Sequence, residues 1–130
     1  MQMNYQHKQL VAASLVAGWD EEEGGQVYGI PIGGTMVREK WTTDGSGSTY
    51  IWGYMDSAYR DDFTKAEAEA FVKEAVALAM SQDGSSGGVI RMHTVDKDGA
   101  EYKFFQGKDI PVFGEELPFV EAPAQGGIVV

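Results

Sequence analysis

The alternation of apolar and polar residues divides the first third of the chain into three segments of strand character. Residues 10–19 are apolar and lack helical spacing, which predicts a strand buried on both faces. Residues 26–32 alternate weakly, and residues 35–43 follow Gly33-Gly34, a pair suited to a tight hairpin turn. We therefore expect three strands before the first helix.

The pattern then changes to the period of helices. Apolar residues recur at helical spacing over 46–59, where Gly53 weakens the helix unless another element packs closely against it. Thr64 and Glu67 stand three apart, as in a capping box that starts a helix. That helix should end at Asp83-Gly84. Its apolar stripe is Ala68, Phe71, Val72, Ala75, Leu78 and Ala79.

Two further strands are expected at 89–95 and 101–105, joined by a turn at 96–99. The segment of about 107–130 should be an irregular, surface-wrapping tail, because it holds three of the four prolines (Pro111, Pro118 and Pro123). Strands and helices thus come in separate blocks. This order predicts the α+β class, with an antiparallel sheet covered by a helix pair.

Length, charge and composition narrow the classes of function. The 130 residues fit a single domain, 1–130. A formal net charge of -10 repels phosphates, so neither nucleic acid nor an anionic membrane is expected as a partner. The absence of cysteine excludes disulfides and thiolate metal sites. The start does not resemble a signal peptide and no apolar run is long enough to span a bilayer, so we expect an intracellular protein.

Two glycine- and serine-rich loops are the candidate sites. Residues 84–88 (GSSGG) satisfy the G-x-S-x-G pattern, but a nucleophilic serine needs a strand before it and a helix after it, and here the helix comes first. His7 and His93 are poor candidates for its general base, so a serine hydrolase that uses Ser86 is a remote alternative. Residues 45–48 (GSGS) allow two interpretations: an anion site at a helix start, or capping by Ser46 or Ser48.

Several blocks, in the same order, resemble the β subunits of the 20S proteasome. They are GWD at 18–20, GGQVY at 24–28, GSGS at 45–48, YR at 59–60 and DGSSGGVIR at 83–91. The resemblance extends from about Leu10 to Pro111, and the most similar type is β1, the caspase-like subunit that cleaves after acidic residues. It implies part of the four-layer αββα sandwich of the N-terminal nucleophile hydrolases. It also implies other proteasome α and β subunits as partners, polypeptide substrates, a location in cytoplasm and nucleus, and no cofactor. No residue is assigned as a metal ligand, and whether the 83–86 loop binds a metal through its backbone carbonyls stays open.

The resemblance also implies roles for three side chains. In that family the amino-terminal threonine is the nucleophile, and its own α-amine, or a water held by it, is the general base. Ser46 and Ser86 correspond to residues that hydrogen-bond the amine and its water. Asp83 corresponds to the residue that orients this network and favours local positive charge. All three are supporting residues, not the nucleophile.

The chain resembles roughly the C-terminal three-fifths of a mature subunit, so we expect the nucleophilic threonine to lie outside it. Thr35 does not replace it, because counting from Thr35 places Ile51 and Glu67 at the family's aspartate and lysine positions. Two functions stay open. The chain is part of a caspase-like threonine endopeptidase, or it is a non-catalytic structural or assembly subunit or a truncated isoform.

A partial sandwich also has a physical consequence. Apolar faces around Leu15, Val16 and Val89 should lack the second sheet that normally covers them. The polypeptide alone is therefore expected to aggregate or to need partners.

Overall fold

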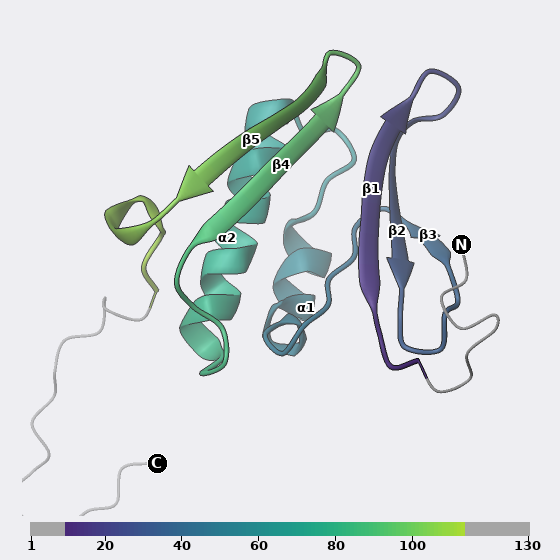
Figure 1. Cartoon of the computed structure of the whole chain (residues 1–130). Coiled ribbons are helices and arrows are strands. Elements are labelled where there is room, and N and C mark those ends of the chain that lie inside the picture. The colour runs from purple at the N-terminus through teal and green to yellow at the C-terminus, as the bar shows by residue number, and fades with distance from the viewer. Residues whose placement is uncertain (1–9, 114–130) are drawn as a thin grey trace, which may run out of the picture.

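The computed structural model of the chain describes residues 10–113. Its strands and helices follow the predicted order (Figure 1). They are β1 (Ser14–Asp20), β2 (Gly24–Ile30), β3 (Val37–Glu39), α1 (Ser48–Ala58), α2 (Lys65–Gln82), β4 (Ile90–Asp96), β5 (Gly99–Phe105) and a short 3-10 helix (Gly107–Asp109). The α+β class is confirmed. Predictions that concern His7, Pro118, Pro123 and the rest of 1–9 and 114–130 lie outside the described residues.

The strands form two antiparallel sheets, so the prediction of one sheet is wrong. Strands β1, β2 and β3 pair in that order, with Val16 opposite Tyr28, and β4 pairs with β5, with His93 opposite Tyr102. Strands β1 and β4 lie side by side near one end and then diverge (Figure 1). The two strands belong to different sheets and form no common ladder.

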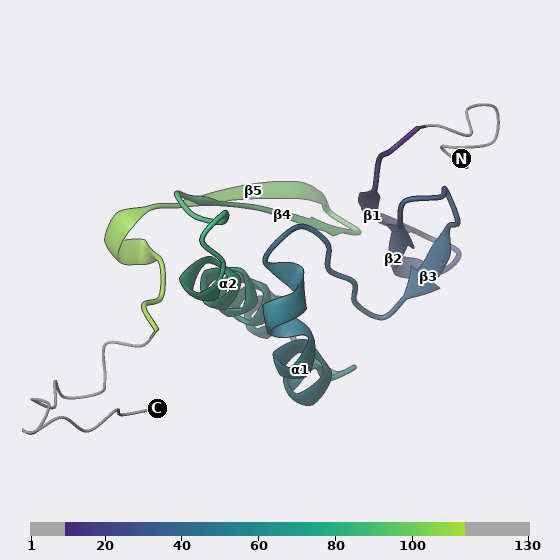
Figure 2. The same ribbon diagram turned by 90° about the horizontal axis from the view of Figure 1, so that it is seen from below.

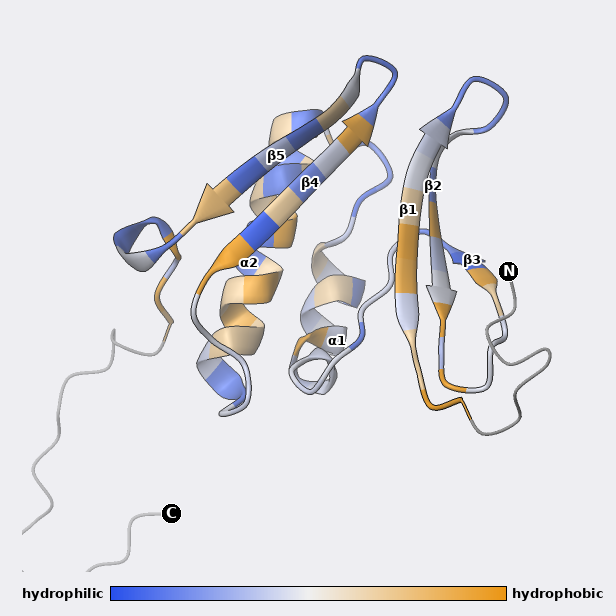
Figure 3. Cartoon of the chain, viewed as in Figure 1, coloured by the Kyte–Doolittle hydropathy of each residue, from blue (hydrophilic) through white to orange (hydrophobic). Residues whose placement is uncertain are grey.

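Two strand predictions are corrected by the structure. The first strand begins at Ser14 and is not buried on both faces, because most of its residues are exposed and the others are half-buried. Leu15 and Val16 are 47% and 49% exposed, and apolar residues mark the middle of strand β1 in Figure 3. Val89 is only half-buried. The third strand is much shorter than 35–43, because its pairing with β2 is limited to three residues.

Both predicted helices are present, and the capping box is confirmed. The Glu67 backbone N–H donates to Thr64 Oγ1 at 3.3 Å, and Glu67 Oε2 accepts the Thr64 backbone N–H at 2.8 Å. Helix α2 packs under β4, and α1 packs along α2, so that both lie on one side of the β4–β5 hairpin (Figure 2). Within residues 10–113, neither helix has the length and hydropathy needed to cross a membrane.

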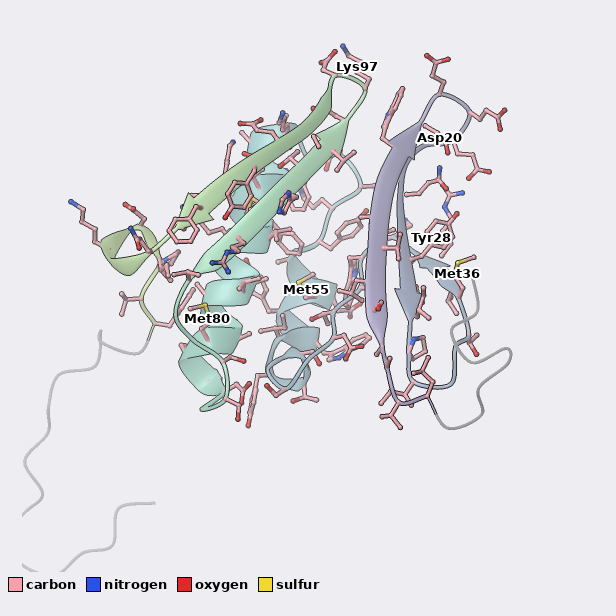
Figure 4. All side chains as sticks on the ribbon, viewed as in Figure 1. Asp20, Tyr28, Met36, Met55, Met80 and Lys97 are labelled. Atoms are coloured by element: carbon pink, nitrogen blue, oxygen red, sulfur yellow. The ribbon has the colours of Figure 1, made fainter. Side chains whose placement is uncertain are left out.

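A cluster of buried apolar side chains lies between the two helices. Ile51 and Met55 of α1 contact Phe71 and Ala75 of α2, and side chains fill the space around Met55 (Figure 4). The Phe71 ring stacks on the Tyr54 ring, with 5.7 Å between the centroids. The expected burial of Phe71 and Ala75 is therefore confirmed.

The predicted apolar stripe of α2 is wrong at one position and incomplete at another. Val72 is 43% exposed and lines an open cavity of about 410 Å³ beside β4. Ala77, which the stripe leaves out, is buried. The hydropathy pattern predicted the helix and the general direction of its apolar face. Packing of α2 against α1 and β4 determines which of its side chains are buried.

Candidate functional site

The loop before α1 and the loop after α2 meet at one carboxylate. The Ser46 hydroxyl donates to Asp83 Oδ2 at 2.5 Å, and the Ser86 hydroxyl donates to the same oxygen at 2.5 Å. The Ser85 backbone N–H donates to Asp83 Oδ1 at 3.1 Å. We call Ser46, Asp83 and Ser86 the serine–aspartate cluster. The structure thus brings together all three side chains singled out in the sequence, and their chemical role stays a prediction.

Helix α2 fixes the position of Asp83. Its capping box sets the first turn, and the Asp83 backbone N–H still donates to Ala79 O at 2.9 Å at the last turn. Asp83 itself is extended, and the chain then turns back so that the Ser86 N–H donates to Asp83 O at 3.1 Å. The end of a well-capped helix therefore holds the carboxylate and brings Ser86 to it.

The other loop does not cap α1 as one interpretation predicted. Gly47 is the N-cap residue and has no side chain that could cap the helix. The two neighbouring serines do not cap it either, because the Ser46 hydroxyl donates to Asp83 and the Ser48 hydroxyl donates to Gly45 O at 2.8 Å. The capping prediction is wrong. The other interpretation was an anion site at the start of α1. The negative group found beside the start of α1 is the chain's own Asp83 carboxylate. The positive end of the helix dipole favours a negative charge at this place.

The cluster favours an ionised carboxylate and presents acceptor oxygens. Asp83 is only 9% exposed, and among residues 10–113 it is the one charged residue that is buried. The Ser46 and Ser86 hydroxyls, followed by the Ser85 N–H, hold the pKa of the Asp83 carboxyl below its ordinary value. Since each hydroxyl donates its one proton to Asp83, its oxygen can only accept from a further group. Such a site suits an amine, an ammonium group or a water molecule.

The lowered pKa predicts a pH dependence of stability. A carboxyl whose pKa is lower in the folded than in the unfolded state stabilises the fold above its unfolded pKa, and this contribution is lost as the pH falls. We expect the melting temperature of the wild type to exceed that of Asp83→Asn at pH 7, and the difference to shrink below about pH 4. Thermal unfolding of both proteins at pH values from about 3 to about 7, a range that includes the ordinary carboxyl pKa, measures this difference in melting temperature. A difference that is constant with pH would contradict the assignment.

Gly47 allows the two loops to meet, and sequence reasoning missed it. A Cβ at this position would lie 3.0 Å from Ser86 Oγ, 3.1 Å from Ala79 Cβ and 3.4 Å from Asp83 Cβ. Its φ of -82° and ψ of -8° are open to any residue, so the requirement for glycine is steric. The available signal was the run of small residues at 45–48.

We expect Gly47→Ala to destabilise the protein by about 1–3 kcal/mol, because the Ala79 Cβ is fixed to helix α2 and cannot move away cheaply. Gly53→Ala in the same helix is the matched control, since its Cβ would meet nothing within 4 Å. The free energy of unfolding of the control should rise by roughly 0.5–1 kcal/mol, because alanine has a higher helix propensity than glycine. Urea unfolding of the two variants measures both changes, and equal effects would rule out the steric explanation.

The structure does not favour a serine hydrolase. Among the described residues, the Ser86 hydroxyl donates to Asp83, and helix α2 precedes it. His93 lies on β4, where its ring packs against the Tyr102 ring, with 4.8 Å between the centroids and 38° between the ring planes. Residues 10–113 also contain no group of three His, Cys, Asp or Glu side chains able to hold a metal ion.

Comparison with known proteins identifies the family. Residues 1–95 match the model of the family described as "Proteasome subunit". The chain is 51% identical over 106 residues to "Proteasome subunit beta type-6" of Dictyostelium discoideum, which covers 82% of this chain and 50% of that protein. It is 50% identical to "Probable proteasome subunit beta type-1" of Schizosaccharomyces pombe, over 86% of this chain and 51% of that protein.

A human relative, "Proteasome subunit beta type-9", is 44% identical over 88% of this chain and 52% of its own length. The chain therefore spans about half the length of the curated relatives that it matches. All three relatives are β subunits, of differently numbered types. The chain belongs to the proteasome subunit family, and within it to the β subunits.

Proposed function

We propose that this chain carries the supporting network of a β1-type, caspase-like threonine endopeptidase of the 20S proteasome core particle. The observation that carries the proposal is the convergence of two serine hydroxyls on Asp83 Oδ2. Both hydroxyl oxygens keep lone pairs that can accept from the α-amine of an amino-terminal threonine. That threonine belongs to a part of the subunit outside these 130 residues.

The cluster acts on the base and not on the substrate. A threonine hydroxyl attacks a peptide carbonyl only if a base takes its proton, and the α-amine is that base in this proposal. Ser46 and Ser86 hold the amine and its water, and the Asp83 carboxylate holds the two hydroxyls. The negative charge of Asp83 also stabilises the ammonium form that appears after proton transfer.

The proposal includes the setting of the whole subunit. The described sheets and helices form part of one domain, a four-layer αββα sandwich, in which further strands cover Leu15 and Val16. Other proteasome α and β subunits are the partners, and polypeptides are the substrates in ubiquitin-dependent degradation. The cytoplasm and the nucleus are the location, with no nucleic acid, membrane or cofactor involved.

Serine variants of the complete, ring-assembled subunit test this role. We expect Ser46→Ala and Ser86→Ala each to lower kcat by about tenfold for a peptide with an acidic residue before the cleaved bond. Ser85→Ala is the matched control, because Asp83 bonds only to the Ser85 backbone N–H, which alanine keeps. Full activity in both test variants, with normal assembly, would refute the proposal.

A non-catalytic structural or assembly subunit is the second candidate. It is favoured by the exposed apolar side chains of strand β1, which suit a subunit interface. In this case the assembled protein would not react with a probe that acylates amino-terminal threonine. Ring assembly would then depend on the surface of strand β1 and not on the serine–aspartate cluster.

A further inference from the structure

The chain contains three Asp-Gly pairs in the described part, and their carboxyl groups have different surroundings. Asp44-Gly45 lies just before the serine–aspartate cluster, Asp83-Gly84 lies within it, and Asp98-Gly99 lies in the β4–β5 turn. Glycine after aspartate matters because its backbone nitrogen has no neighbouring side chain to shield it. Such a nitrogen can attack the preceding carboxyl group and rearrange the backbone.

At Asp44 the reacting groups are already in contact. The Gly45 backbone N–H donates to Asp44 Oδ1 at 2.7 Å, so the nitrogen lies against the carboxyl group that it must attack. Both residues are exposed, and Gly45 has a φ of +96°, in a region open mainly to glycine. Water can therefore reach the bond. The hydrogen bonds next to it are those of a turn, in which Gly45 O accepts from the Ser48 N–H and the Ser48 hydroxyl, and Asp44 belongs to no helix or strand.

The other two pairs are held away from this reaction. Three hydrogen bonds fix the Asp83 carboxylate, which is also buried, and they keep it ionised and thus a poor target for a nucleophile. The Asp98 carboxylate contacts Lys97 Nζ through both oxygens, at 2.9 and 3.1 Å. Gly99 is the first residue of β5 and pairs with Asp96, which restrains the turn.

We propose that Asp44-Gly45 is a site of spontaneous aspartate isomerisation. The Gly45 nitrogen forms a bond to Cγ of Asp44 in its protonated carboxyl form. The proton of that nitrogen and the OH of the carboxyl group leave together as water, which closes a five-membered succinimide. Water then adds to the main-chain carbonyl carbon of Asp44 and breaks its bond to the Gly45 nitrogen. One water leaves and one enters, so no oxidant or other reactant is needed, and the backbone now runs through Cγ as isoaspartate.

The modification lengthens the main chain by one methylene, two residues before Ser46. Since the Ser46 hydroxyl reaches Asp83 from this loop, isomerisation should weaken that hydrogen bond. This consequence for activity rests on the proposed function, whereas the isomerisation itself does not. Accumulation of isoaspartate at Asp44 without any loss of activity would therefore leave the modification site in place and count against the proposed function.

Trypsin separates the three pairs, because they fall on different peptides, 41–60, 74–91 and 98–103. The full chain is incubated at neutral pH with and without urea, and isoaspartate is measured on each peptide by enzymatic carboxyl methylation and mass spectrometry. We expect Asp44 to convert at least about tenfold faster than Asp83 in buffer, and faster than Asp98. In urea the three rates should become similar.

Asp44→Glu is the matched variant, because it keeps the charge and makes the ring closure much slower. Peptide 41–60 also holds Asp56, so fragmentation of the peptide must assign the isoaspartate to position 44, and Asp44→Glu should abolish that part of the signal. Equal rates at Asp44 and Asp83 in buffer, or a faster rate at Asp98, would overturn the proposal. So would a signal on peptide 41–60 that is undiminished in Asp44→Glu, because Asp56 would then be its source.

Discussion

Replacement of Asp83 by Asn in the complete, assembled subunit is expected to lower kcat by about 10- to 100-fold for peptides with an acidic residue before the cleaved bond. Three donors converge on the Asp83 carboxylate, two on Oδ2 and one on Oδ1. An asparagine offers one acceptor oxygen and one NH2 group, so at least one of these donors loses its acceptor. The hydroxyls of Ser46 and Ser86 are then free to rotate away from the amine.

The pH profile of the same variant separates positioning from a general loss of structure. The Asp83 charge favours the ammonium form of the proposed amine, so the neutral base dominates only at higher pH. Without this charge, the acid limb of the kcat/KM profile should move to lower pH. Ser85→Ala serves again as the control and should keep the wild-type profile. A variant that is as active as the wild type, with an unmoved profile, would exclude Asp83 from the site.

Phe71→Ala is expected to cost about 3–5 kcal/mol of unfolding free energy. The Phe71 side chain is 8% exposed, and its ring contacts Tyr54, Phe63 and Tyr59 with centroid distances of 5.7, 5.2 and 6.3 Å. Its loss leaves a cavity between α1 and α2, in the only core cluster that joins the two helices among residues 10–113. One loop of the site leads into α1 and the other follows α2. We therefore expect the hydrogen bonds of the serine–aspartate cluster to weaken as well.

Val72→Ala is the matched control for Phe71→Ala. Val72 is the next residue of α2 but is 43% exposed, so its truncation should cost less than about 1 kcal/mol. Urea unfolding of both variants measures the difference. A similar loss in the two variants would show that the helix interface does not dominate the stability of this chain.

Local patterns predicted the parts of the fold whose causes are local. The capping box at Thr64 and Glu67 needs only four consecutive residues, and helix α2 begins where it indicates. The burial of strand β1 was predicted wrongly, since an apolar run shows that a strand prefers to be covered and cannot show what covers it. Leu15 and Val16 are 47% and 49% exposed, so the described part of the chain leaves about half of each side chain uncovered.

The composition of the two loops marked each as a candidate site, but only the resemblance related Ser46 to Asp83. Ser46 and Asp83 are 37 positions apart, and no periodicity of the chain relates them. Nor does any pattern show that Gly47 must lack a side chain, because the atoms it would meet come from α2 and the following loop. Both facts depend on how α1 packs against α2, which is a tertiary property.

The most direct test is an experimental structure of the complete subunit in its assembled ring. We predict that the α-amine nitrogen of an amino-terminal threonine lies within about 3.2 Å of the Ser46 or the Ser86 hydroxyl oxygen, with Asp83 behind them. An amino terminus that lies on another face of the subunit, with the serine–aspartate cluster closed off from it, would contradict the central claim.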